Sequence, residues 1–198
     1  MVFLHRAAGN PGRLAILPGT FNPVTVAHVA LARAALDLVD EVVFVLPQVF
    51  PHKTYSGASF DERAGMLRDV VGPGDPFSVA ATDGGLFLEI ARECRQAYGN
   101  AVTLELLCGR DAAERVMNWD YGDSGALARM LGEFPLLVAG RQGAYQAPRE
   151  WAGAIRHLEL PGDFQRVSAT EVRERIARGE PWEHLVPAPI RECVRRIY

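Results

Sequence analysis

Hydrogen-bonding side chains and a histidine gather in a loop that follows the first apolar run of the chain. Gly19 permits close backbone approach, and Thr20 and Asn22 supply hydrogen-bonding side chains just before an expected helix. Thr25 and His28 are three residues apart, so they share one face of its first turn, beside free amides and the positive end of the helix dipole. Isolated histidines at helix starts are more often structural, but the run preceding this one favours an anion-binding site.

Lys53 is the only lysine among the 21 lysine and arginine residues of the chain. Arginine can replace lysine on most surfaces, so a retained lysine indicates a place where a compact ammonium is needed and a planar guanidinium cannot substitute. We therefore expect Lys53 to have a functional role, with chance retention as the alternative.

Apolar runs alternate with helix signals along the chain. Strands are predicted at 14–17, 41–46, 77–81, 102–108 and 134–139, with a short one near 157–160. Helices are predicted at 25–39, 59–71, 86–98, after 109–111 and at 168–178, two of them opened by the capping boxes Ser59-Phe60-Asp61-Glu62 and Ser168-Ala169-Thr170-Glu171. Loops are predicted at 119–125 and 140–148. The alternation predicts one α/β domain over residues 1–198, a doubly wound parallel sheet with helices on both faces and a C-terminal helical part from about residue 168.

Ligands of such sheets bind beyond the carboxyl ends of the strands, at helix N-termini. Four segments of this chain fall there, namely 18–28, 47–55, 109–119 and 168–173. These are also the segments in which the unusual residues collect. We therefore expect them to fold together into one site.

Composition and charge narrow the class of protein. The chain has 198 residues, of which 48% are hydrophobic and 23% charged, as in ordinary globular proteins. A formal net charge of −3 argues against a nucleic-acid-binding module, so no nucleic-acid partner is expected. The well-separated Cys94, Cys108 and Cys193 predict neither a disulfide framework nor a cysteine zinc site. The sequence shows no signal-peptide pattern and no apolar run near ~20 residues, so we expect a cytoplasmic protein without a membrane partner.

The motifs resemble, in order, those of the nucleotidylyltransferase superfamily, and in particular its bacterial nicotinate mononucleotide adenylyltransferase branch. The similar segments are 19–28 (G-[ST]-F-[DN]-P-x-[HT]-x-[GA]-H), 47–53 (P-x(3)-P-H-K), 63–66 (R-x-x-M), 109–119 (G-x-D…W), 167–173 (S-x-T-x-[IV]-R) and the closing stretches 178–180 and 185–187. This resemblance spans nearly the whole chain and implies a Rossmann-like fold.

The resemblance implies transfer of a nucleoside monophosphate from a nucleoside triphosphate to an acceptor, with release of pyrophosphate. The branch implies ATP as the donor, nicotinate or nicotinamide mononucleotide as the acceptor, and a step of NAD biosynthesis. The catalytic residues would be His28, donating to the α-phosphate, Lys53, meeting the triphosphate, and Arg173, adding a charge-assisted contact. Mg²⁺ would be held mainly by the ATP phosphates, without an assigned protein ligand.

Further residues would bind the two substrates. The implied nucleotide-binding residues are Gly19, Thr20, Phe21, Asn22, Thr25, Gly109, Asp111, Arg141, Ser168 and Thr170, and the implied acceptor-binding residues are His52 and Trp119. Five of these have a structural alternative: loop ordering for His52, a helix cap for Ser168, core packing for Trp119, a helix N-terminal charge for Asp111 and a strand-end cap for Arg141.

Two segments depart from the family pattern. Thr25 stands where the family usually has a first histidine, and Ala27 where it has glycine, although a related branch acting on phosphopantetheine carries threonine there. Residues 84–90 are largely apolar where the branch usually has hydroxyl groups, which weakens recognition of a polar ring. The alternatives are therefore a different phosphorylated small-molecule acceptor, or a non-catalytic nucleotide-binding protein with a degenerate site. A homo-oligomer is compatible with the sequence.

Overall fold

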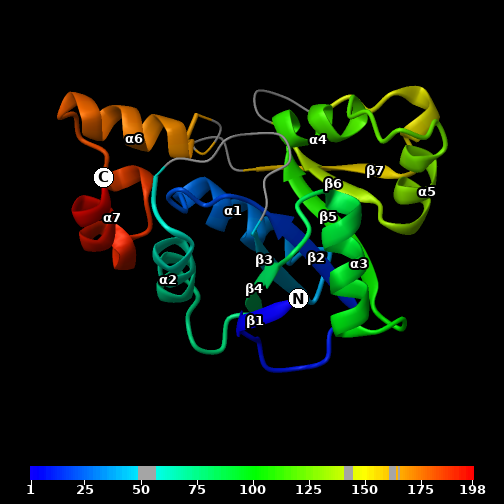
Figure 1. Ribbon diagram of the computed structural model, residues 1–198, viewed down its shortest axis with the longest axis horizontal. Helices are drawn as coiled ribbons and strands as arrows, with labels where there is room; N and C mark the ends of the chain where they lie inside the picture. The colour runs from blue at the N-terminus through cyan, green and yellow to red at the C-terminus, as the bar shows by residue number, and fades with distance from the viewer. Residues whose placement is uncertain (49–56, 141–144, 161–163, 165) are drawn as a thin grey trace.

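The computed structural model describes residues 1–48, 57–140, 145–160, 164 and 166–198 (Figure 1). The described residues form a seven-stranded sheet of order β1-β4-β3-β2-β5-β6-β7. The strands are β1 Val2–His5, β2 Arg13–Pro18, β3 Glu41–Pro47, β4 Phe77–Thr82, β5 Thr103–Gly109, β6 Leu136–Ala139 and β7 Ile155–Leu158. Every neighbouring pair is parallel except β1 with β4. The predicted doubly wound parallel sheet is confirmed, with one antiparallel edge strand added.

Helices cover both faces of this sheet (Figure 1). One face packs against α1 (Val26–Ala35), α2 (Phe60–Val70), α6 (Ala169–Arg178) and α7 (Arg191–Ile197), and the other against α3 (Phe87–Tyr98), α4 (Arg110–Met117) and α5 (Ala126–Glu133). Successive side chains of a strand point to opposite faces. In β2, accordingly, Leu14 and Ile16 join the α3–α5 core, and Ala15 and Leu17 join the α1 core. Short 3₁₀ helices η1 (Arg149–Trp151), η3 (Glu183–Leu185) and η4 (Ala188–Ile190) complete the described elements.

The strand order reverses direction between β2 and β5. The chain runs from β2 through β3 to β4 on one side, and then returns to place β5, β6 and β7 on the other side of β2. The carboxyl ends of β2 and β5 lead directly towards α1 and α4. Open α/β sheets bind their ligands at such a switch point, because the two outgoing connections diverge there.

Two elements were missed from the sequence, and one helix is shorter than predicted. The edge strand β1 is only four residues long, and α5 contains Gly132, yet α5 forms because Met130 and Leu131 are each 1% exposed in the core. The prediction of a helix to residue 39 was wrong at its end, because α1 stops at Ala35 and its last turn tightens through a bond from the Leu36 amide to the Arg33 carbonyl. No helix in the described ranges has the length and apolarity to cross a membrane.

Candidate functional site

A cavity of about 200 Å³ lies at the carboxyl ends of β2, β5 and β6, and we call it the switch-point cavity. Its walls come from these strand ends, from the first turns of α1 and from α4. The lining residues are Leu17, Pro18, Ala27, His28, Leu31, Cys108, Gly109, Asp111, Ala112, Arg115, Ala139, Leu160 and Phe164. The predicted site residues His28, Gly109 and Asp111 therefore lie around one hollow.

His28 is oriented by the first turn of α1. Its Nδ1 accepts a hydrogen bond from the Thr25 backbone N–H at 3.0 Å and lies 2.8 Å from the Thr25 hydroxyl. Because a backbone N–H can only donate, Nδ1 is an acceptor, and the proton of the neutral ring is then carried by Nε2. His28 therefore holds the tautomer whose Nε2 can donate to an anionic oxygen.

Thr25 is the residue that imposes this orientation. It is the N-cap of α1 rather than its first helical residue, and its hydroxyl also accepts from the His28 amide at 3.4 Å. The side chain is fully buried. Its described partner is His28, so in this conformation Thr25 acts on the site through the histidine.

Phe21 packs directly beside the histidine. It is 1% exposed, and its ring meets the His28 ring edge to face, with centroids 5.2 Å apart. Its backbone has φ of 47°, in the left-handed region. The turn needs a glycine at 19, since a Cβ there would come within 2.8 Å of the Phe21 Cζ. The Gly19 amide donates to the Val45 carbonyl at 3.0 Å, which ties the loop to β3.

Asn22 is the meeting point of three distant parts of the chain. Its Oδ1 accepts from the Ala58 amide at 3.2 Å and from the Tyr198 hydroxyl, and its carbonyl accepts from Arg173 Nη1 at 2.5 Å. Gly57 leaves room for this packing, because a Cβ there would lie 2.4 Å from the Asn22 Nδ2. The side chain is 4% exposed, so Asn22 fixes the loop from within.

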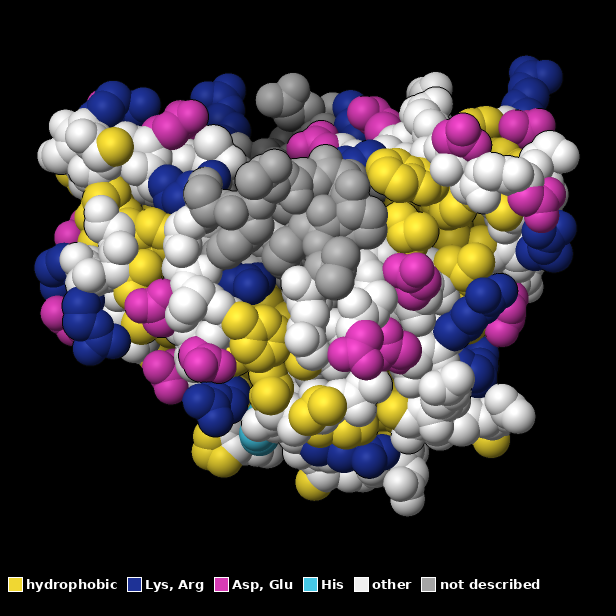
Figure 2. All heavy atoms as spheres, in the orientation of Figure 1, with side chains coloured by type: hydrophobic (Ala, Val, Ile, Leu, Met, Phe, Trp, Pro, Cys, Tyr) yellow, Lys and Arg dark blue, Asp and Glu magenta, His cyan; other side chains and the backbone are white. Residues whose placement is uncertain are grey.

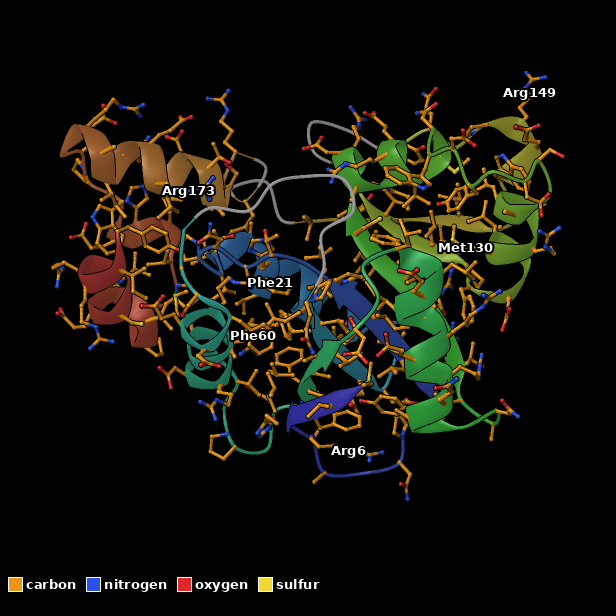
Figure 3. The ribbon with its side chains drawn as sticks, in the orientation of Figure 1. Arg6, Phe21, Phe60, Met130, Arg149 and Arg173 are labelled. Atoms are coloured by element: carbon orange, nitrogen blue, oxygen red, sulfur yellow. The ribbon has the colours of Figure 1, made fainter. Side chains whose placement is uncertain are left out.

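The N-terminus of α6 is brought to this loop by Arg173. The labelled side chain lies on the side of α6 that faces Phe21 (Figure 3). Besides Asn22, the guanidinium donates to the Ala169 carbonyl at 3.2 Å and to the Thr170 hydroxyl at 3.3 Å. The predicted segments 18–28 and 168–173 therefore lie together, and the Arg173 guanidinium joins them.

Ser168 caps α6, as the sequence predicted, but without the full capping box. Its hydroxyl accepts from the Glu171 amide at 3.1 Å. The Glu171 carboxylate instead pairs with Arg175 Nε at 2.5 Å, one turn along the helix, so the reciprocal half of the prediction was wrong. By contrast, the capping box predicted at Ser59 and Glu62 is complete.

Two residues that hold the loop between β2 and α1 were absent from the predicted site. Arg63, 3% exposed on α2, donates through Nη1 to the Thr20 carbonyl at 3.0 Å. The Tyr198 hydroxyl bonds to Asn22, as described above. The R-x-x-M match signalled Arg63, whereas no local pattern marks Tyr198 because its partner is 176 residues away.

At the β5 end, Gly109 is the N-cap of α4, and Asp111 is an exposed carboxylate in its first turn. The neighbouring Cys108 thiol is buried, and burial raises its pKa to about 12. That thiol therefore stays protonated at neutral pH and is a poor nucleophile.

Trp119 lies in a second, smaller hollow of about 50 Å³, which we call the Trp119 groove. Its lining residues are Gly85, Leu86, Phe87, Ala112, Arg115, Val116, Trp119 and Tyr121. Ala112 and Arg115 also line the switch-point cavity, so the two hollows share a wall on α4. Trp119 is half-buried there.

Three predicted site residues, His52, Lys53 and Arg141, lie outside the described residues. Within the described ranges, no three His, Cys, Asp or Glu side chains come together in a way that could hold a metal ion. Asp111 is the one carboxylate among the described residues that line the switch-point cavity.

Comparisons with known proteins agree with this geometry. Residues 16–175 match the model of the cytidylyltransferase-like family. A protein of Chromohalobacter salexigens named "Probable nicotinate-nucleotide adenylyltransferase" is 33% identical, with 93% of this chain and 94% of the relative covered. A Treponema pallidum protein of the same name is 31% identical, with 92% and 96% covered.

Solved structures show the same fold. A Plasmodium falciparum nicotinic acid mononucleotide adenylyltransferase complexed with NaAD superposes with a TM-score of 0.70 at 15% identity, covering 93% of this chain and 95% of the other. The same protein complexed with APC gives a TM-score of 0.71 at 14% identity, covering 93% and 94%.

Proposed function

Because this chain belongs to the cytidylyltransferase-like family of nucleotidyltransferases, we propose that it transfers the adenylyl group of ATP to nicotinate mononucleotide, as a step of NAD biosynthesis. The observation that carries the proposal is the position of His28. It lines the switch-point cavity, and the loop that leads to it is joined by Arg173 to the N-terminus of α6.

The reaction is an in-line displacement at the α-phosphorus of ATP. A phosphate oxygen of the acceptor forms a bond to this phosphorus while the bond to the bridging oxygen breaks, and pyrophosphate leaves. Such a transfer asks little covalent chemistry of the protein, so catalysis consists of positioning and of stabilising charge on the phosphates.

His28 supplies the donor at the reacting phosphate. With Nδ1 occupied by the Thr25 amide, Nε2–H donates to an oxygen of the α-phosphate as charge develops. The ring is fixed in advance by Thr25 and packed against Phe21, so little reorientation is needed when the charge appears.

The start of α6 binds the β- and γ-phosphates. The N-terminal amides and the positive dipole end of this helix favour an anion, and the hydroxyls of Ser168 and Thr170 lie at the same turn. Arg173 adds a charge-assisted contact when it exchanges a carbonyl partner for a phosphate oxygen. Lys53 acts on the triphosphate as a point charge, and His52 and Arg141 contact the acceptor and a phosphate; these three assignments rest on the family resemblance.

Mg²⁺ fits a site of this kind, because an ion bound through ATP phosphates needs at most one or two protein carboxylates. Asp111 is the described carboxylate within reach of the cavity, where it would hold the ion directly or contact a ribose hydroxyl. When bound, the ion neutralises charge on the phosphates and favours departure of pyrophosphate.

The acceptor binds in the Trp119 groove, with its pyridine ring stacked on Trp119. The groove shares its α4 wall with the switch-point cavity, so a mononucleotide whose ring lies in the groove extends its phosphate towards His28.

The test is pyrophosphate release from ATP with a panel of acceptors: nicotinate mononucleotide, nicotinamide mononucleotide and phosphopantetheine. We expect release only when an acceptor is present, and most efficiently with nicotinate mononucleotide. Release with phosphopantetheine alone would replace the acceptor and keep the reaction class. ATP binding without release for any acceptor would contradict catalysis and favour a nucleotide-binding protein.

A further inference from the structure

Among the described residues that line the Trp119 groove, Arg115 is the only one whose side chain carries a formal charge. The remaining lining residues are small, aliphatic or aromatic. In Figure 2, hydrophobic side chains gather between the upper end of α3, α4 and α5, to the right of the grey atoms. A charged substituent on a ligand in this groove would therefore meet Arg115 or remain without a partner of opposite charge.

In the part of the chain that the structure describes, the Arg115 guanidinium has no hydrogen-bonding or ion-pair partner. The side chain is exposed, and no described residue forms a hydrogen bond or an ion pair with it. Asp111 lies one helical turn earlier, at a spacing that often gives ion pairs, and yet no such pair forms between them. Most other helix arginines are used differently, as in the pairs of Arg175 with Glu171 and of Arg178 with Glu180.

Three other polar groups of the groove already have partners within the protein. The Tyr121 hydroxyl donates to the Val116 carbonyl at 3.1 Å, and burial raises the pKa of this phenol, so it stays neutral. The backbone amides of Gly85 and Leu86 both donate to the Glu89 carboxylate at 2.9 Å. Among the described side chains that line the groove, the Trp119 indole N–H and the Arg115 guanidinium are left to meet a ligand.

Arg115 and Trp119 are four residues apart and line the same groove. A planar ring stacked on the indole would lie in the same groove as the guanidinium. Arginine presents a planar fork of donors that matches a carboxylate in two places, whereas a carboxamide offers one acceptor and carries no charge.

We propose that Arg115 is a specificity-determining residue, which pairs with the ring carboxylate of the acceptor and so selects nicotinate over nicotinamide mononucleotide. This inference rests on the proposed function. It also supplies polar recognition that the segment 84–90 offers little of. Leu86 and Phe87 present apolar side chains to the groove, and the amides of Gly85 and Leu86 are already bound by Glu89.

The test compares Arg115→Gln with wild type and with Arg92→Gln. Arg92 is an exposed arginine of α3 that lines none of the hollows described here, so its substitution controls for the loss of one surface charge. The two mononucleotides share ribose and phosphate, so the ratio of their kcat/KM values isolates the ring substituent. Calorimetric titration of each mononucleotide without ATP provides a second readout that does not require turnover.

We expect Arg115→Gln to lower kcat/KM for nicotinate mononucleotide by about tenfold or more, the size of a partly exposed charge-assisted hydrogen bond. The value for nicotinamide mononucleotide should change by less than about threefold, and Arg115→Lys should be intermediate because it keeps the charge and loses the fork. Arg92→Gln should leave both values unchanged.

An equal loss for both acceptors would overturn the proposal, because it would place Arg115 on the shared phosphate or in a structural role. An unchanged ratio in Arg115→Gln would overturn it as well. If wild type releases pyrophosphate with neither mononucleotide, the proposed function fails. The titrations then decide on Arg115 separately, and equal wild-type affinities for the two ligands would exclude selection by this residue.

Discussion

The switch-point cavity and the Trp119 groove differ in how their polar groups are held. The loop that leads to His28 is buried and held by Arg63, Arg173 and Tyr198, each from a different part of the fold. The groove is small and mostly apolar, and Arg115 is the one cation among its described lining residues. A fixed set of donors suits phosphate chemistry, which needs preorganisation, whereas a groove with few polar contacts sets acceptor choice with little effect on the reacting groups.

The largest expected effect is on the cavity side. His28→Ala should lower kcat by about two orders of magnitude or more, because a preorganised donor to the α-phosphate is lost. The free energy of unfolding should fall by only about 1 kcal/mol, since the variant also loses the contact that caps the Thr25 amide. Steady-state pyrophosphate release and urea unfolding measure the two effects. The control is His184→Ala, because His184 is an exposed histidine. Turnover near wild type in His28→Ala would remove His28 from the mechanism.

Arg173→Ala should reduce kcat/KM for ATP by about tenfold to a hundredfold, because it removes both a phosphate contact and the tie to the Asn22 carbonyl. Arg178→Ala, on the same helix and paired with Glu180, should leave ATP kinetics unchanged. Kinetics at varied ATP concentration measure the effect. Equal behaviour of the two variants would show that α6 does not bind the triphosphate.

Trp119→Ala should raise the KM for the acceptor by about tenfold, because it removes the stacking surface of the groove, and should leave ATP affinity unchanged. Trp119→Phe keeps a ring and should recover part of the loss. ATP titration and acceptor kinetics separate the two sites. A matching loss of ATP affinity would mean that the groove and the cavity act as a single site and that the contrast drawn above is wrong.

The smallest effect on turnover is expected from Tyr198→Phe, which removes only the hydroxyl that donates to Asn22. The free energy of unfolding should fall by about 1 kcal/mol, the usual value of a partly buried hydrogen bond, with kcat within a few-fold of wild type. Urea denaturation measures the change. An unaltered midpoint would show that the loop is held without this contact.

The sequence was informative where the signal is local. The alternation of apolar runs and caps predicted the parallel sheet, and the spacing of Thr25 and His28 marked the start of α1. Local patterns also misled, because Thr25 was placed within the helix although it is the N-cap, and the predicted Glu171 contact to Ser168 is replaced by a pair with Arg175.

Contacts between distant residues, and the absence of a contact, could not be predicted from the sequence. Nothing near Asn22 in the sequence indicates that its partners are residues 58, 173 and 198. The role proposed for Arg115 depends on two observations that only the structure provides. Arg115 forms no ion pair with Asp111, and the Gly85 and Leu86 amides are bound by Glu89.

The position of Asn22 also bears on when the protein becomes competent to bind nucleotide. Its partners lie 36, 151 and 176 residues away along the chain, so the loop reaches its final shape only after the most non-local contacts of the fold have formed. Local opening that releases α6 or α7 would loosen this loop while most of the sheet stays intact. Nucleotide affinity would then depend on whether these last contacts have formed. By the same linkage, an excess of ATP would stabilise the fully folded chain relative to its partly opened forms.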